Sequence, residues 1–358
     1  MPKSHLSGRG AQSNVRNIYQ RQQYVQEHIE AIDDWEREAP KTETTIVYPK
    51  SLVNKVSSPD VGMAYSANPY QGCEHGCIYC YARNSHQYWG YSAGLDFESK
   101  ILVKANSARL FKSFITKKTW DGSPISLSGN TDCYQPAERR FELTRNILKV
   151  ALEYGQPVGL ITKNSLILRD LDLLAPLAAK GLCRVFLSIN SLNKETRGKL
   201  EPRTATAEQR LHTLEKLADN GIPVGVMCAP IIPGLTDHEI PAVLAAARKA
   251  GAKWAGYTIV RLNGEIGEIF HKWLATAYPE RAAKIWHSIQ SCHQGKVNDS
   301  EFGNRMRGTG KLAEMIGDQF RIHCKRNGLN VEPFDYDYSH FGNRRSHQLN
   351  LFDGVNNC

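Results

Sequence analysis

Three cysteines within one short, glycine-containing stretch are the residues of this chain best suited to chemistry. Cys73, Cys77 and Cys80 follow a C-x3-C-x2-C spacing, with Gly72 and Gly76 beside them. Glycine lets the backbone curl, so three thiolates can face one inorganic centre. Such thiolates are the usual protein ligands of a [4Fe–4S] cluster. Because this cluster has four irons, three protein thiolates leave one iron open for a substrate or a second cofactor.

Structural zinc is the alternative for the same residues. His86 would complete a set of three thiolates and one imidazole, and structural zinc prefers four such ligands in a closed tetrahedron. Zinc ribbons usually supply their ligands as two separated close pairs, whereas the next cysteine, Cys133, stands alone. Ligand number and softness therefore favour an iron–sulfur cluster. A zinc-stabilised, non-catalytic nucleic-acid-binding protein stays open as the alternative from another class.

The longer string NPYQGCEHGCIYCYAR, residues 68–83, has Tyr79 directly before the last cysteine. It resembles the radical S-adenosylmethionine (radical SAM) superfamily, and within it the subgroup similar to spore photoproduct lyase and "DNA repair photolyase"-like proteins. In this superfamily the open iron chelates S-adenosylmethionine. One electron then cleaves the sulfonium to methionine and a 5′-deoxyadenosyl radical, which abstracts hydrogen from a substrate. The resemblance therefore implies two cofactors, a [4Fe–4S] cluster and S-adenosylmethionine, and a low-potential electron donor such as flavodoxin or ferredoxin.

The elements that must position these residues follow a repeated pattern from residue 62 to 265. Helical stretches end at Gly155, Gly181, Gly221 and Gly251, and a β-rich run follows each one. Glycine readily adopts the left-handed conformation that closes a last helical turn, and such units feed a parallel sheet. Strands are expected near residues 63–67, 125–128, 158–162, 185–189, 223–229 and 255–260, with a short extra strand at 101–104.

Six such units fall short of the eight that close a complete barrel. They match the open, partial (β/α)6 TIM-like barrel of the superfamily that the chain resembles. The expected fold class is therefore α/β, with a helical C-terminal extension. In parallel α/β sheets, chemistry gathers at the carboxyl ends of the strands. The residues that follow each strand are thus the candidates for cofactor binding.

Small and polar residues follow the second expected strand. They supply donors and acceptors for a zwitterionic amino acid, and they stand where the superfamily contacts the methionine amino group: Ser128, Gly129, Asn130, Thr131 and Asp132. The competing interpretation is an ordinary turn with a helix cap. Lys163, after the third strand, is a candidate partner of the cofactor carboxylate, although a lone lysine can also be a surface charge.

Later strand ends supply the remaining cofactor candidates. Ser188 and Asn190, at the end of the fourth strand, are expected to face the ribose. The segment Glu201-Pro-Arg203-Thr resembles the Glu-x-Arg-Thr segment of spore photoproduct lyase relatives, which makes Arg203 a fork for a carboxylate. An internal ion pair between Glu201 and Arg203 is the competing interpretation. Tyr79 is expected to offer aromatic contact to the adenine.

Cys133 is the candidate catalytic residue. In spore photoproduct lyase, a cysteine that returns a hydrogen atom to the product radical lies just before a Thr-Ser-Asp-like string. Here Gly129 holds that place, and Cys133 comes after Thr131-Asp132. This departure puts the dimer-splitting reaction of the lyase in doubt. Cys133 can still serve as a thiol donor, and a small core residue is the competing interpretation.

The flanking regions carry weaker signals. Residues 1–61 are expected to form a mobile basic arm, a short acidic helix near 27–38 and an irregular lead-in. Residues 266–340 are expected to form a helical cap, with helices at 268–290 and 311–327, followed by a flexible tail at 341–358. From Gln348 to Phe352 this tail reads QLNLF and resembles the peptide by which bacterial DNA repair proteins bind the sliding clamp. A tail that folds back onto its own domain is the alternative.

Composition narrows the class of protein. The chain of 358 residues is long enough for one large domain with appendages. No apolar run approaches the ~20 residues that span a bilayer, so no membrane association is expected. The polar N-terminus lacks the apolar segment of a secretory signal, and nine cysteines without export fit a reducing cytoplasm.

The resemblance, the formal net charge of +9 and the clamp-like peptide together favour a nucleic-acid substrate, with DNA ahead of RNA. An enzyme that acts on a base must first bring it out of the stack, and an open barrel could admit it. Solvated lysines explain the charge equally well. A radical SAM enzyme that modifies a protein or RNA is the alternative within the same class.

Overall fold

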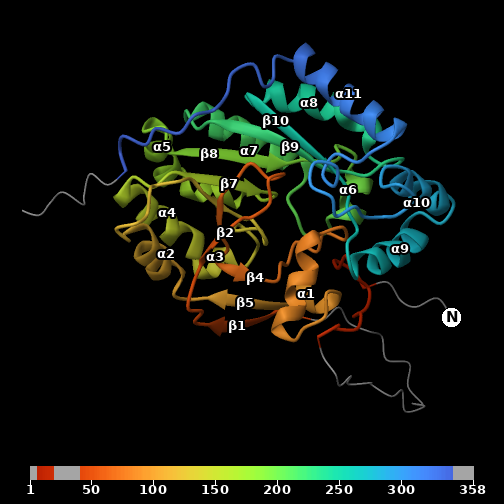
Figure 1. Ribbon diagram of the computed structural model, residues 1–358, viewed down its shortest axis with the longest axis horizontal. Coiled ribbons are helices and arrows are strands. Elements are labelled where there is room, and N and C mark those ends of the chain that lie inside the picture. Colours follow the sequence, from red (N-terminus) through yellow and green to blue (C-terminus); the bar gives the residue numbers. More distant parts are fainter. Residues whose placement is uncertain (1–5, 20–40, 342–358) are drawn as a thin grey trace, which may run out of the picture.

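The computed structural model describes residues 6–19 and 41–341. Its centre is a seven-stranded sheet with the order β10-β9-β8-β7-β6-β3-β2 (Figure 1). All strands except the antiparallel edge strand β2 (Val53–Lys55) run parallel. The parallel strands are β3 (Tyr65–Ala67), β6 (Ile125–Leu127), β7 (Val158–Thr162), β8 (Cys183–Ser188), β9 (Val224–Ile231) and β10 (Trp254–Ile259). The six expected strands and the open, partial barrel are therefore confirmed.

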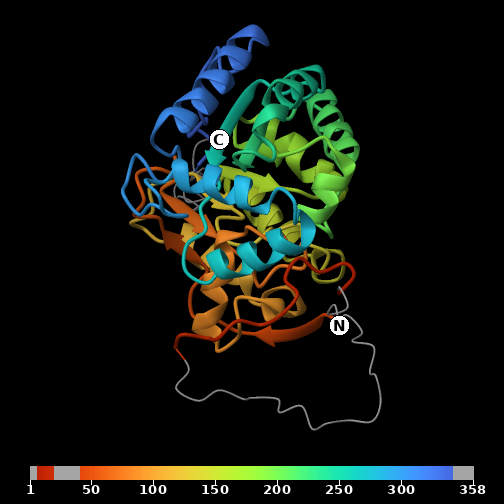
Figure 2. The same cartoon turned by 90° about the vertical axis from the view of Figure 1, so that its right-hand side faces the viewer.

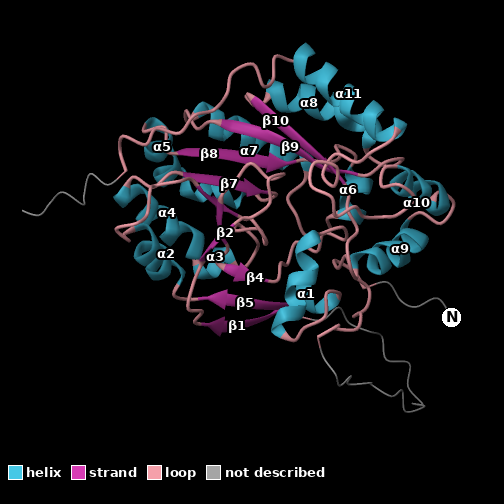
Figure 3. Ribbon diagram, in the orientation of Figure 1, coloured by secondary structure: helices cyan, strands magenta, loops and turns pink. Residues whose placement is uncertain are grey.

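Helices cover the outer face of this sheet (Figure 3). They are α4 (Leu143–Tyr154), α5 (Leu171–Ala179), α7 (Ala207–Asp219) and α8 (Ile240–Lys249), with the short η2 (Ser165–Asp170) and η3 (Asp237–Glu239) leading into α5 and α8. Alternate strand residues such as Val185 and Leu187 are fully buried against these helices. Each such side chain contributes about 1.5–3 kcal/mol when buried. The four glycines expected to end helices all have positive φ, as the pattern required.

A second, three-stranded sheet differs from the expectation. The extra strand exists as β5 (Lys100–Lys104), but it pairs with β1 (Glu43–Val47) and β4 (Tyr70–Gln71) rather than with the barrel. The lead-in at 41–61 was expected to be irregular, and this was wrong, because it contains β1 and β2. The β-branched run Thr44-Thr45-Ile46-Val47 favours a strand. Helices α1 (Leu95–Ser99), α2 (Ser107–Ile115) and α3 (Glu138–Phe141) complete this part of the chain.

The described part of the N-terminal segment, residues 6–19, is not a free arm. The backbone amides of Gly10 and Ala11 donate to the carboxylate of Glu98, at 3.0 and 2.8 Å. Val15 exchanges two hydrogen bonds with the side chain of Ser92. This segment is therefore held against the body by buried polar contacts. The expected acidic helix near 27–38 lies outside the described residues.

Three helices follow the barrel. The expected helix at 268–290 is divided into α9 (Ile266–Ala277) and α10 (Ala282–Ser291), because Pro279 between them has no backbone N–H to donate. Helix α11 (Lys311–Arg326) matches the expectation and packs on α8 and β10. Among the described helices, none has the length and apolarity to cross a membrane.

Residues 329–341 run across the amino-terminal ends of the parallel strands (Figure 1). The side chain of Asn330 bonds to both backbone groups of Ala255 in β10, and the Asp337 amide donates to the Gly181 carbonyl before β8. This segment closes the end of the barrel that lies opposite the strand carboxyl ends. The clamp-like peptide lies outside the described residues.

Candidate cluster and cofactor site

The three cysteines lie in a tight loop that leads from β4 into the helix η1 (Tyr81–Trp89). All three thiols are free, and Cys73 and Cys77 are buried. Gly72 and Gly76 both have positive φ. A side chain at Gly72 would approach the Lys100 carbonyl oxygen to 2.8 Å. These two glycines therefore allow the tight turns of the loop that carries the thiols.

The thiols are close enough to influence one another. Burial raises the pKa of Cys77 to about 12, with Glu201 and the neighbouring Cys80 adding to the rise and Lys163 opposing it. Burial also raises the pKa of Cys73 well above its usual value, with contributions from Asp132 and from both other cysteines. Binding of a soft metal centre requires the thiolate forms, so these groups must release protons when the centre binds. This donor set suits an iron–sulfur cluster.

The zinc alternative fits the geometry less well. Within the described ranges, no three His, Cys, Asp or Glu side chains converge closely enough to hold a single metal ion. His86, the expected fourth zinc ligand, is fully buried in an aromatic environment, where it stacks on Tyr91 and meets the edge of Phe97. Thiolates bound to separate irons of a cube can stay further apart than the ligands of one zinc ion. The loop therefore favours a cluster.

A buried polar network fixes the cysteine loop to the carboxyl ends of β6 and β7. Asp132 lies 3.3 Å from Nδ1 of His75, which stands between the first two cysteines. The carboxylate of Asp132 also accepts hydrogen bonds from the Thr162 hydroxyl at 2.7 Å and from the Lys163 amide at 2.9 Å. Burial would raise the pKa of Asp132, but His75 and the amide lower it to about 2. Asp132 is thus ionised and is committed to holding the loop.

The segment before Asp132 is folded against the same loop. The backbone amides of Asn130 and Thr131 both donate to Oδ1 of Asn68, at 2.7 and 3.2 Å. Ser128 adopts a positive φ of 77°, and its hydroxyl accepts from the Cys133 amide at 2.8 Å. A side chain at Gly129 would lie 2.6 Å from Cβ of Ser66. The structure therefore brings this predicted segment next to the cysteines.

Tyr81, directly after the last cysteine, joins the two segments. Its hydroxyl donates to the Gly129 carbonyl at 2.7 Å. Tyr81 exposes 57% of its surface, yet burial raises its pKa to about 12. Tyr81 thus links the predicted cofactor segment to the cysteine loop through one hydrogen bond.

Lys163 and Asn190 approach the cysteines from neighbouring strands. Burial would lower the pKa of Lys163, but Cys77, Glu201 and Asp132 raise it above its usual value. Asn190 is 4% exposed, and its Oδ1 has no hydrogen-bond partner among the described residues. A buried acceptor without a partner is costly. Its position at the end of β8 suits a ligand hydroxyl, such as those of a ribose.

Sequence reasoning missed a buried ion pair behind this site. Glu201 pairs with Arg210, and both side chains are almost completely buried. The Tyr79 hydroxyl donates to Glu201 and accepts from Nδ2 of Asn190 at 3.3 Å. Arg210 also donates to the Ser188 carbonyl at 2.7 Å. Tyr79 and Ser188 are thus tied to this pair.

The competing interpretation of an internal Glu201–Arg203 pair was wrong. Arg203 instead lies 3.5 Å from Glu74 and is one-third exposed. Arg210 stands on α7, between the buried residues Ala207 and Leu214. The one sequence feature that pointed to this buried pair was an arginine among the apolar positions of a helix. Whether Arg203 contacts a cofactor carboxylate stays a prediction.

Cys133 is fully buried in the main apolar core. Its carbonyl accepts from the Thr144 hydroxyl at 2.6 Å, and burial raises the pKa of its thiol well above the usual value. The residue follows directly after Asp132, so its backbone belongs to the site. Its role as a hydrogen-atom donor stays a prediction.

Comparisons with known proteins concern the family and the fold of this chain. The family model described as "Radical SAM superfamily" matches residues 67–247. An uncharacterized protein of Mycobacterium tuberculosis is 33% identical over 238 residues, covering 66% of this chain and 70% of the relative. An uncharacterized protein of Methanocaldococcus jannaschii is 34% identical over 199 residues, covering 56% and 71%. The radical SAM Nα-GlyT isomerase of Pseudomonas phage M6 is 24% identical over 246 residues, covering 64% and 49%.

Among solved structures, the chain is similar to spore photoproduct lyase complexed with dinucleoside spore photoproduct. The TM-score is 0.55 at 16% sequence identity, with 80% of each chain covered. A spore photoproduct lyase variant with bound AdoMet and the same dinucleoside gives a TM-score of 0.56 at 16% identity, with 82% of this chain and 86% of the variant covered. At this low sequence identity, the similarity shows a shared fold.

Proposed function

Because this chain belongs to the radical SAM superfamily, we propose that it is an iron–sulfur enzyme that cleaves S-adenosylmethionine reductively in order to abstract hydrogen from a nucleic acid. When bound, the cluster and S-adenosylmethionine supply the electron and the 5′-deoxyadenosyl group for this reaction. The observation that carries the proposal is the buried loop of Cys73, Cys77 and Cys80, fixed through Asp132 to the carboxyl edge of a parallel sheet.

The residues of the chain have separate tasks in this proposal. The three cysteines would hold the cluster, and His75 with Asp132 would keep their loop in place. Lys163 provides a cation beside the cysteines for an anionic group of the cofactor. Asn190 offers a free acceptor to a cofactor hydroxyl, and the Glu201–Arg210 pair orients it through Tyr79. Burial of these groups excludes water and strengthens their electrostatic effects.

Exposed aromatic side chains support a nucleic-acid substrate. Tyr81, Tyr88 and Trp89 of η1 expose 57%, 74% and 43% of their surfaces directly after the third cysteine. Tyr19 stacks on Tyr88 with ring centroids 4.8 Å apart. Exposed rings of this kind can stack on unpaired bases, and the net charge of +9 favours a polyanion. The dinucleoside named for spore photoproduct lyase is a further support.

The reaction on the nucleic acid would be a repair or modification step, in the reducing cytoplasm that an iron–sulfur cluster requires. The test is anaerobic reconstitution followed by reduction in the presence of S-adenosylmethionine. We expect a brown protein with about four irons per chain and formation of 5′-deoxyadenosine. Cys77→Ala should abolish both, whereas Cys183→Ala, in the apolar core, should retain both.

The substrate class is tested with deuterated material. Deuterated single-stranded DNA, double-stranded DNA, RNA and lysate protein are supplied separately, and deuterium in 5′-deoxyadenosine is measured by mass spectrometry. The proposal expects transfer from a nucleic acid, with DNA ahead of RNA. Transfer from protein alone would refute the nucleic-acid part and leave the radical SAM reaction standing.

A further inference from the structure

A recess of about 740 Å³ opens beside the cysteine loop but outside the barrel. Three parts of the chain line it: the N-terminal segment at Ser7–Arg9 and Gln12, helix α6 (Lys194–Leu200), and α9 at Trp273. Figure 2 shows the N-terminal segment, in red, running beside the cyan helices α9 and α10. None of the cofactor candidates described above lines this recess.

One wall of the recess is a single layer of backbone. Arg9 and Gln12 line the recess, although the buried Arg9 guanidinium turns away to donate to the Glu98 carbonyl. Gly10 and Ala11 between them contact the cysteine loop. A side chain at Gly10 would lie 1.9 Å from the Gly76 carbonyl oxygen, so the two backbones touch. Ala11 packs in the same apolar group as Cys77.

The opposite wall is equally thin. Arg197, Gly198 and Lys199 line the recess, and the next residue, Leu200, is fully buried against the cysteine loop. The Leu200 carbonyl accepts a hydrogen bond from the Ile78 amide at 3.1 Å. A partner bound in the recess would therefore be separated from the cysteine loop by a single layer of backbone at each wall.

The rim is basic. Among the described residues that line the recess, Arg9, Lys194, Arg197 and Lys199 are basic and Glu195 alone is acidic. The buried Arg9 donates to the Glu98 carbonyl, and Arg197 donates to the Glu201 and Thr204 carbonyls, so both charges lie behind the walls. Lys194 and Lys199 stand at the rim, where Lys199 pairs with Glu195 at 2.8 Å. This excess of positive charge favours a partner with an acidic surface.

We propose that this recess is the docking site of an acidic one-electron carrier protein that reduces the cluster. The inference rests on the proposed function, because only a redox centre needs such a partner. One electron leaves the reduced carrier and enters the oxidised cluster, and no covalent bond forms or breaks. Electron transfer slows steeply with distance, and the recess approaches the cysteines through the thin walls described above.

A nucleic acid suits this recess less well than an acidic protein. Its only aromatic lining residue among those described, Trp273, is 5% exposed and offers no ring face for stacking. The exposed rings lie on η1 instead. The substrate and the electron carrier would thus approach the site over different surfaces, which allows both to be bound at once.

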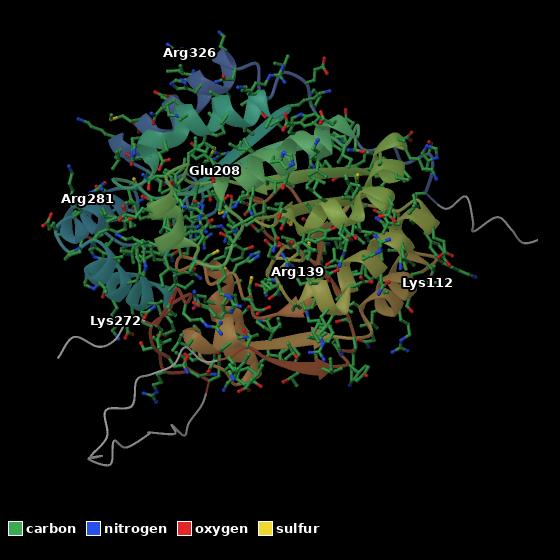
Figure 4. The ribbon with its side chains drawn as sticks, turned by 180° about the vertical axis from the view of Figure 1, so that it is seen from behind. Lys112, Arg139, Glu208, Lys272, Arg281 and Arg326 are labelled. Atoms are coloured by element: carbon green, nitrogen blue, oxygen red, sulfur yellow. The ribbon has the colours of Figure 1, made fainter. Side chains whose placement is uncertain are left out.

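The test compares two electron sources in the full-length, reconstituted enzyme. A Lys194→Glu/Lys199→Glu variant reverses two charges of the rim. The matched control, Lys112→Glu/Lys149→Glu, makes the same charge change on α2 and α4. Figure 4 labels Lys112 and Lys272, the neighbour of Trp273, on opposite sides of the molecule. The rate of 5′-deoxyadenosine formation is measured with reduced, acidic bacterial flavodoxin and, separately, with dithionite.

We expect the rim variant to lose at least about tenfold in rate with flavodoxin at low ionic strength. It should keep the wild-type rate with dithionite, and the control variant should keep both rates. Added salt should slow the flavodoxin reaction of the wild type. A rim variant with unchanged flavodoxin kinetics would overturn the proposal.

Three further outcomes distinguish the explanations. If the rim variant also fails with dithionite, the milder Lys194→Gln/Lys199→Gln variant is tested in the same way. Equal loss with both electron sources in that variant would also overturn the docking site. Failure of the wild type with dithionite would instead refute the proposed function itself. A single-stranded oligonucleotide that protects Lys194 and Lys199 from acetylation, where flavodoxin does not, would assign the recess to nucleic acid.

Discussion

The carboxylate of Asp132 lies 3.3 Å from Nδ1 of His75, and both side chains are buried. His75 belongs to the cysteine loop, whereas Asp132 follows the end of β6. The pair therefore connects the loop that carries the thiols to the sheet that positions the cofactor candidates. The buried Asp132 carboxylate is costly unless its hydrogen-bond partners stay in place.

Replacement of Asp132 by asparagine should loosen the cysteine loop. Weakening the hydrogen bonds of a buried carboxylate costs about 1–3 kcal/mol, so we expect a lower midpoint of thermal unfolding and less iron per chain after reconstitution. Asp172→Asn is the control, because Asp172 is 57% exposed in its pair with Arg145. Equal iron content and equal unfolding midpoints in the two variants would show that the pair does not hold the loop.

Arg210 should matter more to stability than Arg203. Arg210→Ala leaves Glu201 buried without its partner, at a cost of about 3–5 kcal/mol. Arg203 is one-third exposed in its pair with Glu74, and such pairs contribute about 1 kcal/mol or less. Denaturant unfolding of both variants measures the difference. A larger loss of unfolding free energy in Arg203→Ala than in Arg210→Ala would contradict the stabilising role of the buried pair.

Asn190→Ala should weaken S-adenosylmethionine binding about fivefold, since one hydrogen bond contributes about 1 kcal/mol. The iron content should stay at the wild-type level, because Asn190 does not contact the cysteine loop except through Tyr79. Equilibrium dialysis of the reconstituted protein measures the binding. Asn193→Ala, at the exposed N-terminus of α6, is the control. Unchanged affinity in Asn190→Ala would remove this residue from the cofactor site.

Gly10→Ala should displace the N-terminal segment from the cysteine loop. The added methyl group would lie 1.9 Å from the Gly76 carbonyl oxygen, whereas one at Gly62 meets nothing within 4 Å. We expect faster loss of the cluster in air for Gly10→Ala than for Gly62→Ala, measured by the decay of absorbance near roughly 400 nm. Identical decay would mean that the segment does not shield the loop.

Lys104 should make the free energy of unfolding depend on pH, and a single substitution can test this. Burial lowers its pKa to about 8, below the value of about 10.4 in unfolded chains. The unfolded state therefore binds more protons between these values, and stability rises with pH across this window. Lys104→Met should remove this rise. The unfolding free energy of the wild type minus that of the variant should rise by about 3 kcal/mol from pH 7 to 10.5. A constant difference would contradict the lowered pKa.

The parts of the fold with strong local signals were predictable. Helix-ending glycines such as Gly155 and Gly181 marked four of the six barrel strands, and the cysteine spacing marked the loop. Strand β1 was missed because it is exposed along most of its length and has no alternation of apolar and polar residues. The pairing of Glu201 with Arg210 across nine positions depends on how α6 and α7 pack, which no local pattern specifies.

The central claim is that three cysteines hold a cluster with one open iron. Mössbauer spectroscopy of the reconstituted protein, with and without S-adenosylmethionine, tests it most directly. The account predicts about four irons per chain, one of which changes its spectrum when S-adenosylmethionine is added. A single zinc per chain, or a cluster whose irons all ignore S-adenosylmethionine, would contradict it.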